Sequence, residues 1–266
     1  MEGSRLSDVA RQFANVFMAT FQIAASYTVG STVGSIAQEY RSLILPATYA
    51  FAIWGPIFIL CGFYTLLQAL PAHRENSVYR AIGWWTAGAF LMNGAWSYAY
   101  TSRQFILAQA IIFAGLVFAG GSYLRFVRVV PAVRATRIDN WLIGPTLGLL
   151  SGWITAANTV GLAGTLIVQG FVATGRAAEI RDAALLLLGS AVAFFVILAS
   201  RNGPNGAWVS YSAAVLWALL AIIVEQRSTS TITSAAAAVS AILALSAAFG
   251  PWGTRAQLAR QAESAA

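Results

Sequence analysis

Residues 46–70 read PATYAFAIWGPIFILCGFYTLLQAL, a stretch without a single charged side chain. About 20 apolar residues in a helix, at ~1.5 Å each, match the ~30 Å hydrocarbon core of a bilayer. The stretch is therefore predicted to cross a membrane as one helix. Its first half carries four aromatic side chains: Tyr49, Phe51, Trp54 and Phe58. Proline lacks an N–H and its ring clashes with the preceding turn, so Pro56 has two interpretations. Either it bends the helix and makes the aromatic side a concave wall, or it is tolerated and the aromatic side chains are packing residues and interfacial anchors.

The composition extends the membrane prediction to the whole chain. Of 266 residues, 58% are hydrophobic and only 9% are charged, whereas soluble domains have about a quarter charged. Seven further apolar runs accompany residues 46–70, at 12–33, 80–101, 104–126, 140–162, 183–200, 207–224 and 232–249. We therefore expect an all-α membrane protein with about eight transmembrane helices. Membrane lipids are its expected surroundings.

The arginines indicate an orientation. The formal net charge is +7, and every cationic side chain is an arginine. With eight spans, eleven arginines share one side: Arg5, Arg11, Arg74, Arg80, Arg125, Arg128, Arg134, Arg137, Arg201, Arg255 and Arg260. By the positive-inside rule both termini should be cytoplasmic, in a multi-pass protein of a bacterial inner membrane. The arginines lie between apolar runs and form no stripe, so we expect no nucleic-acid partner.

Several kinds of chemistry lack their usual residues. Without lysine there is no attachment point for a Schiff-base cofactor such as retinal. The one histidine, His73, follows an apolar run in a polar loop, and Cys61 is the only cysteine, so we expect neither a metal site nor a disulfide. The acidic residues fall in loops or at the ends of the runs, which disfavours ion-coupled transport. No catalytic constellation is visible, and we do not expect an enzyme.

Neutral polarity lies beside aromatic rings in residues 80–101. Asn93, Trp96, Ser97 and Tyr100 are spaced i, i+3, i+4 and i+7, so they share one helical face. Polar groups inside hydrocarbon need partners, so this face should look into the bundle. It has two interpretations. Either Asn93 makes an interhelical hydrogen bond within aromatic packing, or the face is the wall of a pocket for a flat apolar ligand with polar edges.

Residues 140–162 combine small residues with one large ring. Glycine recurs every four residues, at Gly144, Gly148 and Gly152. Such a stripe allows close helix contact, with another span or with a second subunit in a homodimer or membrane complex. Trp153 lies on an adjoining face with Ala157 one turn further on, and Asn158 is a neutral polar group at the same depth. Core packing and a ligand pocket are both compatible with this pattern.

Three stretches carry a resemblance to a known family. They are PATYAFAIWG at 46–55, LMNGAWSYAY at 91–100 and LSGWITAANTVGLA at 150–163. The chain resembles the tryptophan-rich sensory proteins related to TspO and the mitochondrial translocator protein, in particular their longer, eight-span branch. Thr48 replaces a glycine of that pattern. Gly161 stands where the family has an asparagine eight positions after the tryptophan.

The resemblance implies a fold and a class of ligand. It implies a TspO-like five-helix bundle in residues 1–165 and three additional transmembrane helices in residues 166–266. The family binds porphyrins and haem-pathway tetrapyrroles, sterols, and synthetic isoquinoline and benzodiazepine compounds inside the five-helix bundle. Carried onto this sequence, it suggests six lining residues, to which the residue pattern adds Tyr49 and Asn158. The candidate ligand-binding set is Tyr49, Trp54, Phe58, Asn93, Trp96, Trp153, Ala157 and Asn158.

These observations favour an integral membrane receptor or carrier for a planar apolar ligand, a porphyrin or other tetrapyrrole or a sterol-like lipid. Its role would be sensing or trafficking, with no obligatory cofactor. Two alternatives stay open, a non-catalytic structural subunit of a larger membrane complex and an uncoupled transporter of a small solute.

Overall fold

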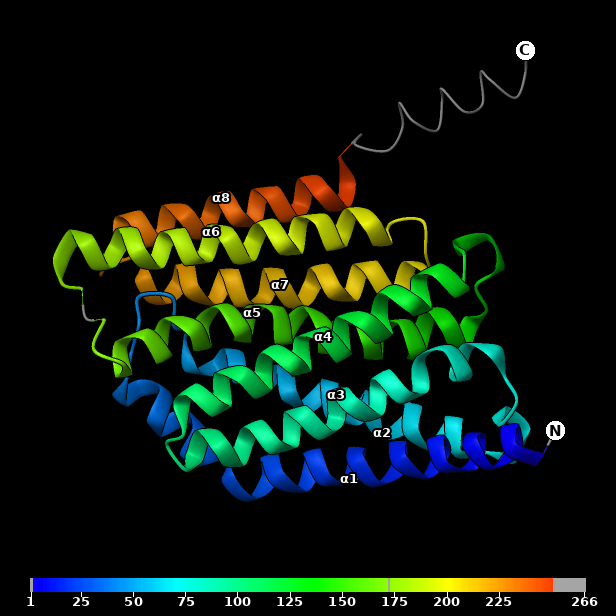
Figure 1. Ribbon diagram of the computed structural model, residues 1–266. Coiled ribbons are helices and arrows are strands. Elements are labelled where there is room, and N and C mark those ends of the chain that lie inside the picture. The colour runs from blue at the N-terminus through cyan, green and yellow to red at the C-terminus, as the bar shows by residue number, and fades with distance from the viewer. Residues whose placement is uncertain (1, 172, 251–266) are drawn as a thin grey trace, which may run out of the picture.

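The computed structural model describes residues 2–171 and 173–250, which form a bundle of long helices (Figure 1). No strand occurs within these ranges. The eight long helices are α1 (Glu2–Glu39), α2 (Trp54–Ala69), α3 (Ser77–Thr101), α4 (Phe105–Val129), α5 (Gly144–Val168), α6 (Gly175–Ser200), α7 (Asn205–Gln226) and α8 (Thr231–Phe249). They lie side by side with nearly parallel axes. The all-α prediction is confirmed.

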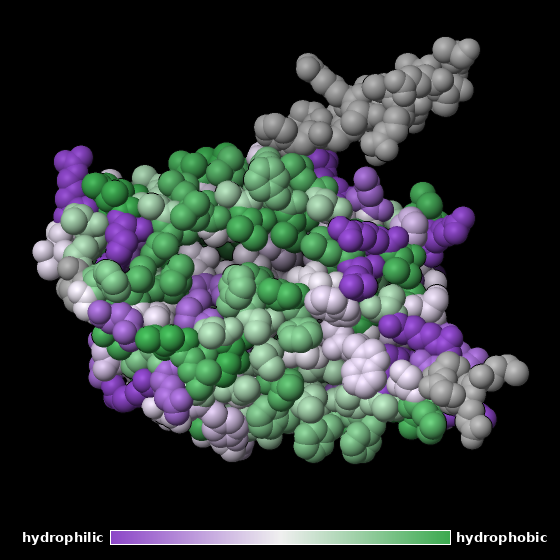
Figure 2. All heavy atoms as spheres, in the orientation of Figure 1, coloured by the Kyte–Doolittle hydropathy of each residue, from purple (hydrophilic) through white to green (hydrophobic). Residues whose placement is uncertain are grey.

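Among the residues that the structure describes, six helical stretches are long and apolar enough to cross a membrane by length and composition. They are Thr48–Ala69, Phe105–Val129, Asp139–Val168, Gly175–Ser200, Asn205–Gln226 and Thr231–Phe249. The other two long helices, α1 and α3, pack against each other and bury polar side chains such as Gln22 and Asn93, which lowers their apolarity. Figure 2 shows hydrophobic residues mainly over the middle of the bundle and hydrophilic ones gathered toward its two ends. The chain is a multi-pass membrane protein.

Residues 46–70 differ from the single helix that we expected. The backbone is extended at Ala47, with φ −52° and ψ 142°, and a 3₁₀ helix, η1, spans Thr48–Ile53 before α2 begins. Pro56 therefore lies in the first turn of α2 rather than in a helix interior. A proline is tolerated there because the first N–H groups of a helix have no intrahelical acceptor. The single helix expected over residues 46–70 is thus divided between η1 and α2, and a bend at Pro56 stays a prediction.

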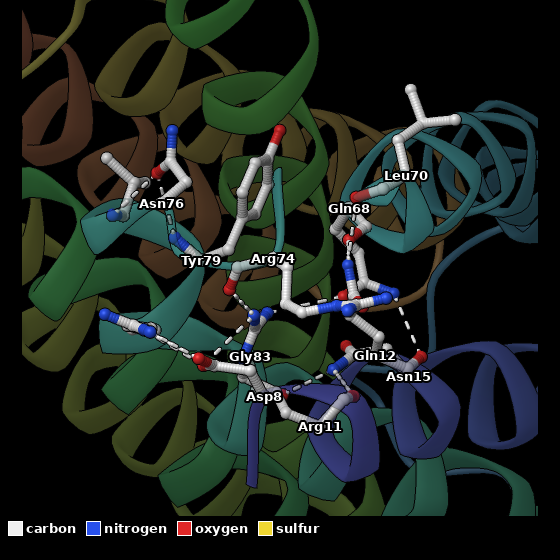
Figure 3. Close-up of polar contacts among 12 residues, drawn as sticks. Asp8, Arg11, Gln12, Asn15, Gln68, Leu70, Arg74, Asn76, Tyr79 and Gly83 are labelled. Atoms are coloured by element: carbon white, nitrogen blue, oxygen red, sulfur yellow. Dashed lines mark hydrogen bonds and ion pairs between the residues drawn. The ribbon is translucent and has the colours of Figure 1, made fainter. Parts of the chain in front are cut away.

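The first helix is longer than the apolar run at 12–33 and carries charged residues into the packed interface. Asp8 and Arg11 are both buried, and only 1% of Arg11 is exposed. Arg11 donates from Nη2 to the carbonyl of Arg74 at 2.7 Å, and Asp8 accepts hydrogen bonds from Arg80 (Figure 3). The sequence pattern places both residues before the first apolar run, so it does not predict their burial within a helix. The partners come from α3 and from the turn before it, so a hydropathy pattern does not reveal them.

Amide side chains continue this polar cluster along α1. Gln12 donates from Nε2 to the carbonyl of Gln68 at 2.7 Å, and Gln68 returns a bond to the Gln12 carbonyl at 3.1 Å. Asn15 donates to the carbonyl of Gly83 at 2.8 Å. Figure 3 shows these side chains pointing toward one another between α1, α2 and α3. Because buried polar groups are costly unless paired, this reciprocal bonding fixes the three helices at the N-terminal end of α1.

The glycine stripe of α5 lies against α7 of the same chain. A Cβ on Gly148 would lie 2.4 Å from the carbonyl oxygen of Ala207, and one on Gly152 would lie 2.6 Å from that of Tyr211. The backbones of α5 and α7 are thus in direct contact, as small-xxx-small stripes allow. The sequence left open whether the stripe packs against another span or against a second subunit. In the structure it packs against α7, which occupies the surface that a second subunit would need. The division into residues 1–165 and 166–266 stays a prediction.

Candidate functional site

A cavity of about 90 Å³ lies among α1, α3, α5 and the segment that joins α1 to α2. Six of its lining residues are aromatic: Tyr40, Phe51, Trp54, Trp96, Tyr100 and Trp153. The remaining wall is built from small and aliphatic residues and from Ser42 and Asn93. None of the lining residues is charged. The cavity therefore offers flat apolar surfaces and a few neutral hydrogen-bonding groups.

Trp153 is the centre of the aromatic wall. Its ring lies edge to face with that of Trp54, with centroids 6.4 Å apart and planes at 87°, and similarly with that of Phe51 at 6.1 Å and 83°. Trp54 in turn stacks on Phe58 at 5.1 Å. These distances lie in the range of favourable aromatic pairs. The rings hold one another in place and leave the cavity beside them open, although Trp153 is only 3% exposed.

A second space of about 580 Å³ adjoins the first. The two share five lining residues, Val33, Phe51, Trp54, Asn93 and Trp96. The second space has Phe58 on its α2 side and small or hydroxyl residues on its α1 side, namely Ser26, Gly30, Ser31, Gly34 and Ser35. Its lining is also uncharged. Together the two spaces reach the size at which small-molecule sites are usually found.

Asn93 is the polar group placed between the two spaces. Its Nδ2 donates to Oε1 of Gln22 on α1 at 3.1 Å, and this bond fixes the amide. In the part of the chain that the structure describes, Oδ1 of Asn93 accepts no hydrogen bond, and the indole N–H groups of Trp54, Trp96 and Trp153 donate none. One acceptor and several donors on residues that line the cavity thus have no partner among the described residues. Asn93 thus makes the predicted interhelical hydrogen bond and also lines the cavity.

The structure brings most of the candidate residues together. Trp54, Asn93, Trp96, Trp153 and Ala157 line the smaller space, and three of them also line the larger one with Phe58. These contacts establish where the side chains lie, and ligand binding by them stays a prediction.

Two candidates lie elsewhere. Tyr49 is 48% exposed and packs edge to face on Trp217 of α7, with centroids 5.6 Å apart. The 3₁₀ turn directs it away from the cavity. Asn158 donates from Nδ2 to the carbonyls of Ile112 at 2.9 Å and Ile154 at 3.1 Å, so its amide joins α5 to α4 instead of facing the cavity. Neither residue lines either space.

Sequence reasoning missed the contribution of the joining segment and of α7. Tyr40, Ser42, Leu45 and Pro46 line the cavity from one side, and Ala218 of α7 does so from another. Helical spacing relates residues within one helix only, so it gives no signal for a loop folded over a bundle. Gly161, the position at which the sequence departs from the family pattern, also lines the cavity, and a Cβ there would lie 2.9 Å from Oε1 of Gln109.

The arrangement is suited to binding. Stacking on indole rings and burial of apolar area are the interactions that it offers a ligand. Within residues 2–171 and 173–250 no group of three or more His, Cys, Asp or Glu side chains is placed to hold a metal ion.

Comparison with known proteins gives a family. Neither the curated proteins nor the solved structures contain a match to the chain. A family model described as TSPO-like protein matches residues 9–249, which takes in the cavity and the last three helices alike. The chain therefore belongs to the TSPO-like protein family.

Proposed function

We propose that the protein is a membrane receptor or carrier that binds a planar, largely apolar ligand, a porphyrin-type tetrapyrrole or a sterol-like lipid, for sensing or trafficking. The observation that carries the proposal is the convergence of Trp54, Trp96 and Trp153 on one uncharged cavity. At ~25 cal/mol per Å², burial of a few hundred Å² of ligand surface supports micromolar binding after the costs of association.

The uncharged lining also limits how such a ligand lies. Burying a carboxylate without a cation is costly, so the ring system of a porphyrin belongs among the indoles and its carboxylates belong at the mouth. Tyr40 lines the cavity, and Nη1 of Arg103 donates to its hydroxyl at 3.0 Å, so this cation is one hydrogen bond away from the lining. Arg103 is also paired with Glu39, whose two oxygens accept at 2.8 Å each.

We propose the same membrane orientation that the arginines suggest, with the termini cytoplasmic in a bacterial inner membrane. The N-terminus and the α2–α3, α4–α5 and α6–α7 connections lie at one end of the bundle (Figure 1). Nine of the eleven arginines assigned to the cytoplasmic side belong to that end. The other two, Arg255 and Arg260, lie outside the described residues.

Quenching of tryptophan fluorescence by protoporphyrin IX in detergent tests the proposed site. We expect saturable quenching by the wild type, and a dissociation constant at least about ten-fold higher in Trp96→Ala and in Trp153→Ala, since each removes a stacking surface. Trp84→Ala is the matched control, because Trp84 is 49% exposed and lines neither space.

Two alternatives give different results. If both cavity variants bind as tightly as the wild type, the site is rejected and a structural subunit becomes the better interpretation. A small-solute flux in proteoliposomes that protoporphyrin IX does not inhibit would favour the uncoupled transporter.

A further inference from the structure

The segment that covers the cavity contacts the cavity on one side and helices α6 and α7 on the other. We define the roof as residues 40–51, between the end of α1 and the middle of η1. Tyr40, Ser42, Leu45, Pro46 and Phe51 of the roof line the cavity. Five residues between or beside them contact α6 or α7, namely Arg41, Leu43, Ala47, Tyr49 and Ala50. Two of the last three helices, α6 and α7, thus contact the roof, and α7 also lines the cavity directly through Ala218.

The contact with α6 is a buried hydrogen bond to a carboxylate. The backbone N–H of Leu43 donates to Oδ2 of Asp182 at 2.7 Å. Asp182 is fully buried, and its Oδ1 accepts from Nε of Arg181 at 2.7 Å. Bonds to a charged acceptor are stronger than neutral ones, and a buried carboxylate is costly without them. The sequence prediction began this helix at residue 183, which placed Asp182 in a loop.

The contacts with α7 are spread over two turns of that helix. Arg41 forms an ion pair with Glu225, and the N–H of Ala47 donates to the carbonyl of Ala221 at 3.2 Å. One turn nearer the start of α7, Nε1 of Trp217 donates to the carbonyl of Ala50 at 2.9 Å. The ring of Trp217 packs edge to face on that of Tyr49. Each anchored residue lies within two positions of a residue that lines the cavity.

Contacts with the other helices are fewer. Nε2 of Gln38 donates to the hydroxyl of Thr48 at 3.3 Å, and the ring of Tyr40 lies edge to face with Phe105 at 5.1 Å. Among the described residues, apart from the bond from the N–H of Tyr40 that continues α1 and those that continue η1 into α2, the roof backbone bonds to other helices through Asp182, Ala221 and Trp217.

We propose that α6 and α7 position the roof of the cavity, with Asp182, Glu225 and Trp217 as positioning residues that set how often the roof opens. Given the proposed function, they set the rates at which a ligand enters and leaves without touching it. Opening the roof breaks the Leu43–Asp182 bond and the Arg41–Glu225 pair while leaving the indole walls in place. The two contacts differ in exposure, so they respond differently to salt.

The ion pair permits a charge-reversal test of ligand kinetics with protoporphyrin IX as the probe. We expect Arg41→Glu and Glu225→Arg each to raise its dissociation rate by about two- to five-fold, the range that an exposed pair supports. The double variant, which restores opposite charges, should return the rate toward that of the wild type, and high salt should narrow the differences. A double variant as fast as the singles would overturn the role of this pair.

Hydrogen exchange tests the roof without any ligand. In Asp182→Asn, which keeps the shape but weakens the acceptor, we expect amides of residues 41–50 to exchange at least about ten-fold faster. Asp139→Asn is the matched control, because Asp139 is buried at the other end of the bundle and accepts from Thr136. Roof exchange unchanged in Asp182→Asn and in Glu225→Arg overturns the proposal.

The ligand-kinetics experiment depends on the proposed function, whereas the hydrogen-exchange experiment tests the role of α6 and α7 without a ligand. If protoporphyrin IX binds no variant, the wild type included, the proposed function fails, and the exchange measurement still decides whether α6 and α7 hold the roof. Should Asp182→Asn fail to fold, Glu225→Arg and Trp217→Phe carry the exchange measurement, because they alter side chains that are only partly buried.

Discussion

Arg11 crosses Gly83 so closely that a Cβ on residue 83 would lie 2.6 Å from Cδ of Arg11 (Figure 3). The arginine cannot move aside easily, because it is buried and its Nη2 donates to the carbonyl of Arg74. We therefore expect Gly83→Ala to lower the free energy of unfolding by about 1–3 kcal/mol, the usual cost of overpacking. Denaturation in detergent by SDS or heat measures it.

Gly62→Ala is the control for this substitution. Gly62 lies within α2, and a Cβ there would meet nothing within 4 Å. Alanine favours a helix interior over glycine by up to ~1 kcal/mol, so this variant should be as stable as the wild type or more stable. Equal losses in the two variants would show that the contact with Arg11 is not the cause.

The ion pair between Asp8 and Arg80 predicts a loss of stability in acid. Hydrogen bonds from Arg80 lower the pKa of the Asp8 carboxyl below its ordinary value of 3.8, although burial opposes them. A lowered pKa in the folded state stabilises the protein above the unfolded value, and that contribution disappears as the pH falls through the folded value. Melting temperatures measured from about pH 6 down to about pH 3 should fall less in Asp8→Asn than in the wild type. Parallel curves would contradict this.

Much of the cavity wall could be predicted because it depends on local periodicity. Asn93 and Trp96 are three residues apart on one helix, and Trp153 and Ala157 are four apart on another, so α-helical spacing alone places each pair on one face. The sequence also indicated that neutral polar groups within a bilayer must face inward. The structure agrees for all four residues.

The remaining features depend on contacts distant in sequence. Tyr49 lies outside the cavity because a 3₁₀ turn precedes α2 and because Trp217, far along the chain, packs against it. Asp182 is buried in α6 because the N–H of Leu43 reaches it from the roof. A hydropathy pattern reads a charged residue as the end of a span, so it cannot identify charges that distant partners neutralise.

The close contact of α5 with α7 predicts intolerance of a single methyl group. A Cβ on Gly148 would lie 2.4 Å from the carbonyl oxygen of Ala207, which is backbone and cannot rotate away. We expect Gly148→Ala to separate the two helices and to lower the free energy of unfolding by about 3 kcal/mol or more. SDS or thermal denaturation checks this, with Gly120→Ala as control, since nothing lies within 4 Å of a Cβ there. A fully stable Gly148→Ala protein would contradict the observed packing.

A larger side chain in the cavity should abolish ligand binding without lowering the stability of the protein. Ala157 lines the space of about 90 Å³, and leucine at this position adds three carbon atoms to it. One surplus methylene in an apolar pocket already changes affinity by about 10–200-fold, so Ala157→Leu should abolish saturable quenching by protoporphyrin IX. Its thermal stability should be unchanged or higher, because the added side chain occupies empty space. Ala184→Leu, on an exposed position of α6, should bind normally, and undiminished binding by Ala157→Leu would place the ligand elsewhere.

Substitution of the two buried asparagines should lower stability to a similar extent but affect ligand binding differently. Asn158 joins α5 to α4 by donating to the carbonyl of Ile112 at 2.9 Å and by accepting a long bond from Gln109 at 3.5 Å, and Asn93 joins α3 to α1 by donating to Gln22. We expect Asn158→Ala and Asn93→Ala each to lower the free energy of unfolding by about 1 kcal/mol. Only Asn93 lines the cavity, so only Asn93→Ala should also weaken protoporphyrin IX binding, by about five-fold or more for a lost hydrogen bond. Denaturation and quenching titrations on the same preparations give both quantities, and an equal loss of affinity in the two variants would mean that the amide of Asn93 acts through the fold alone.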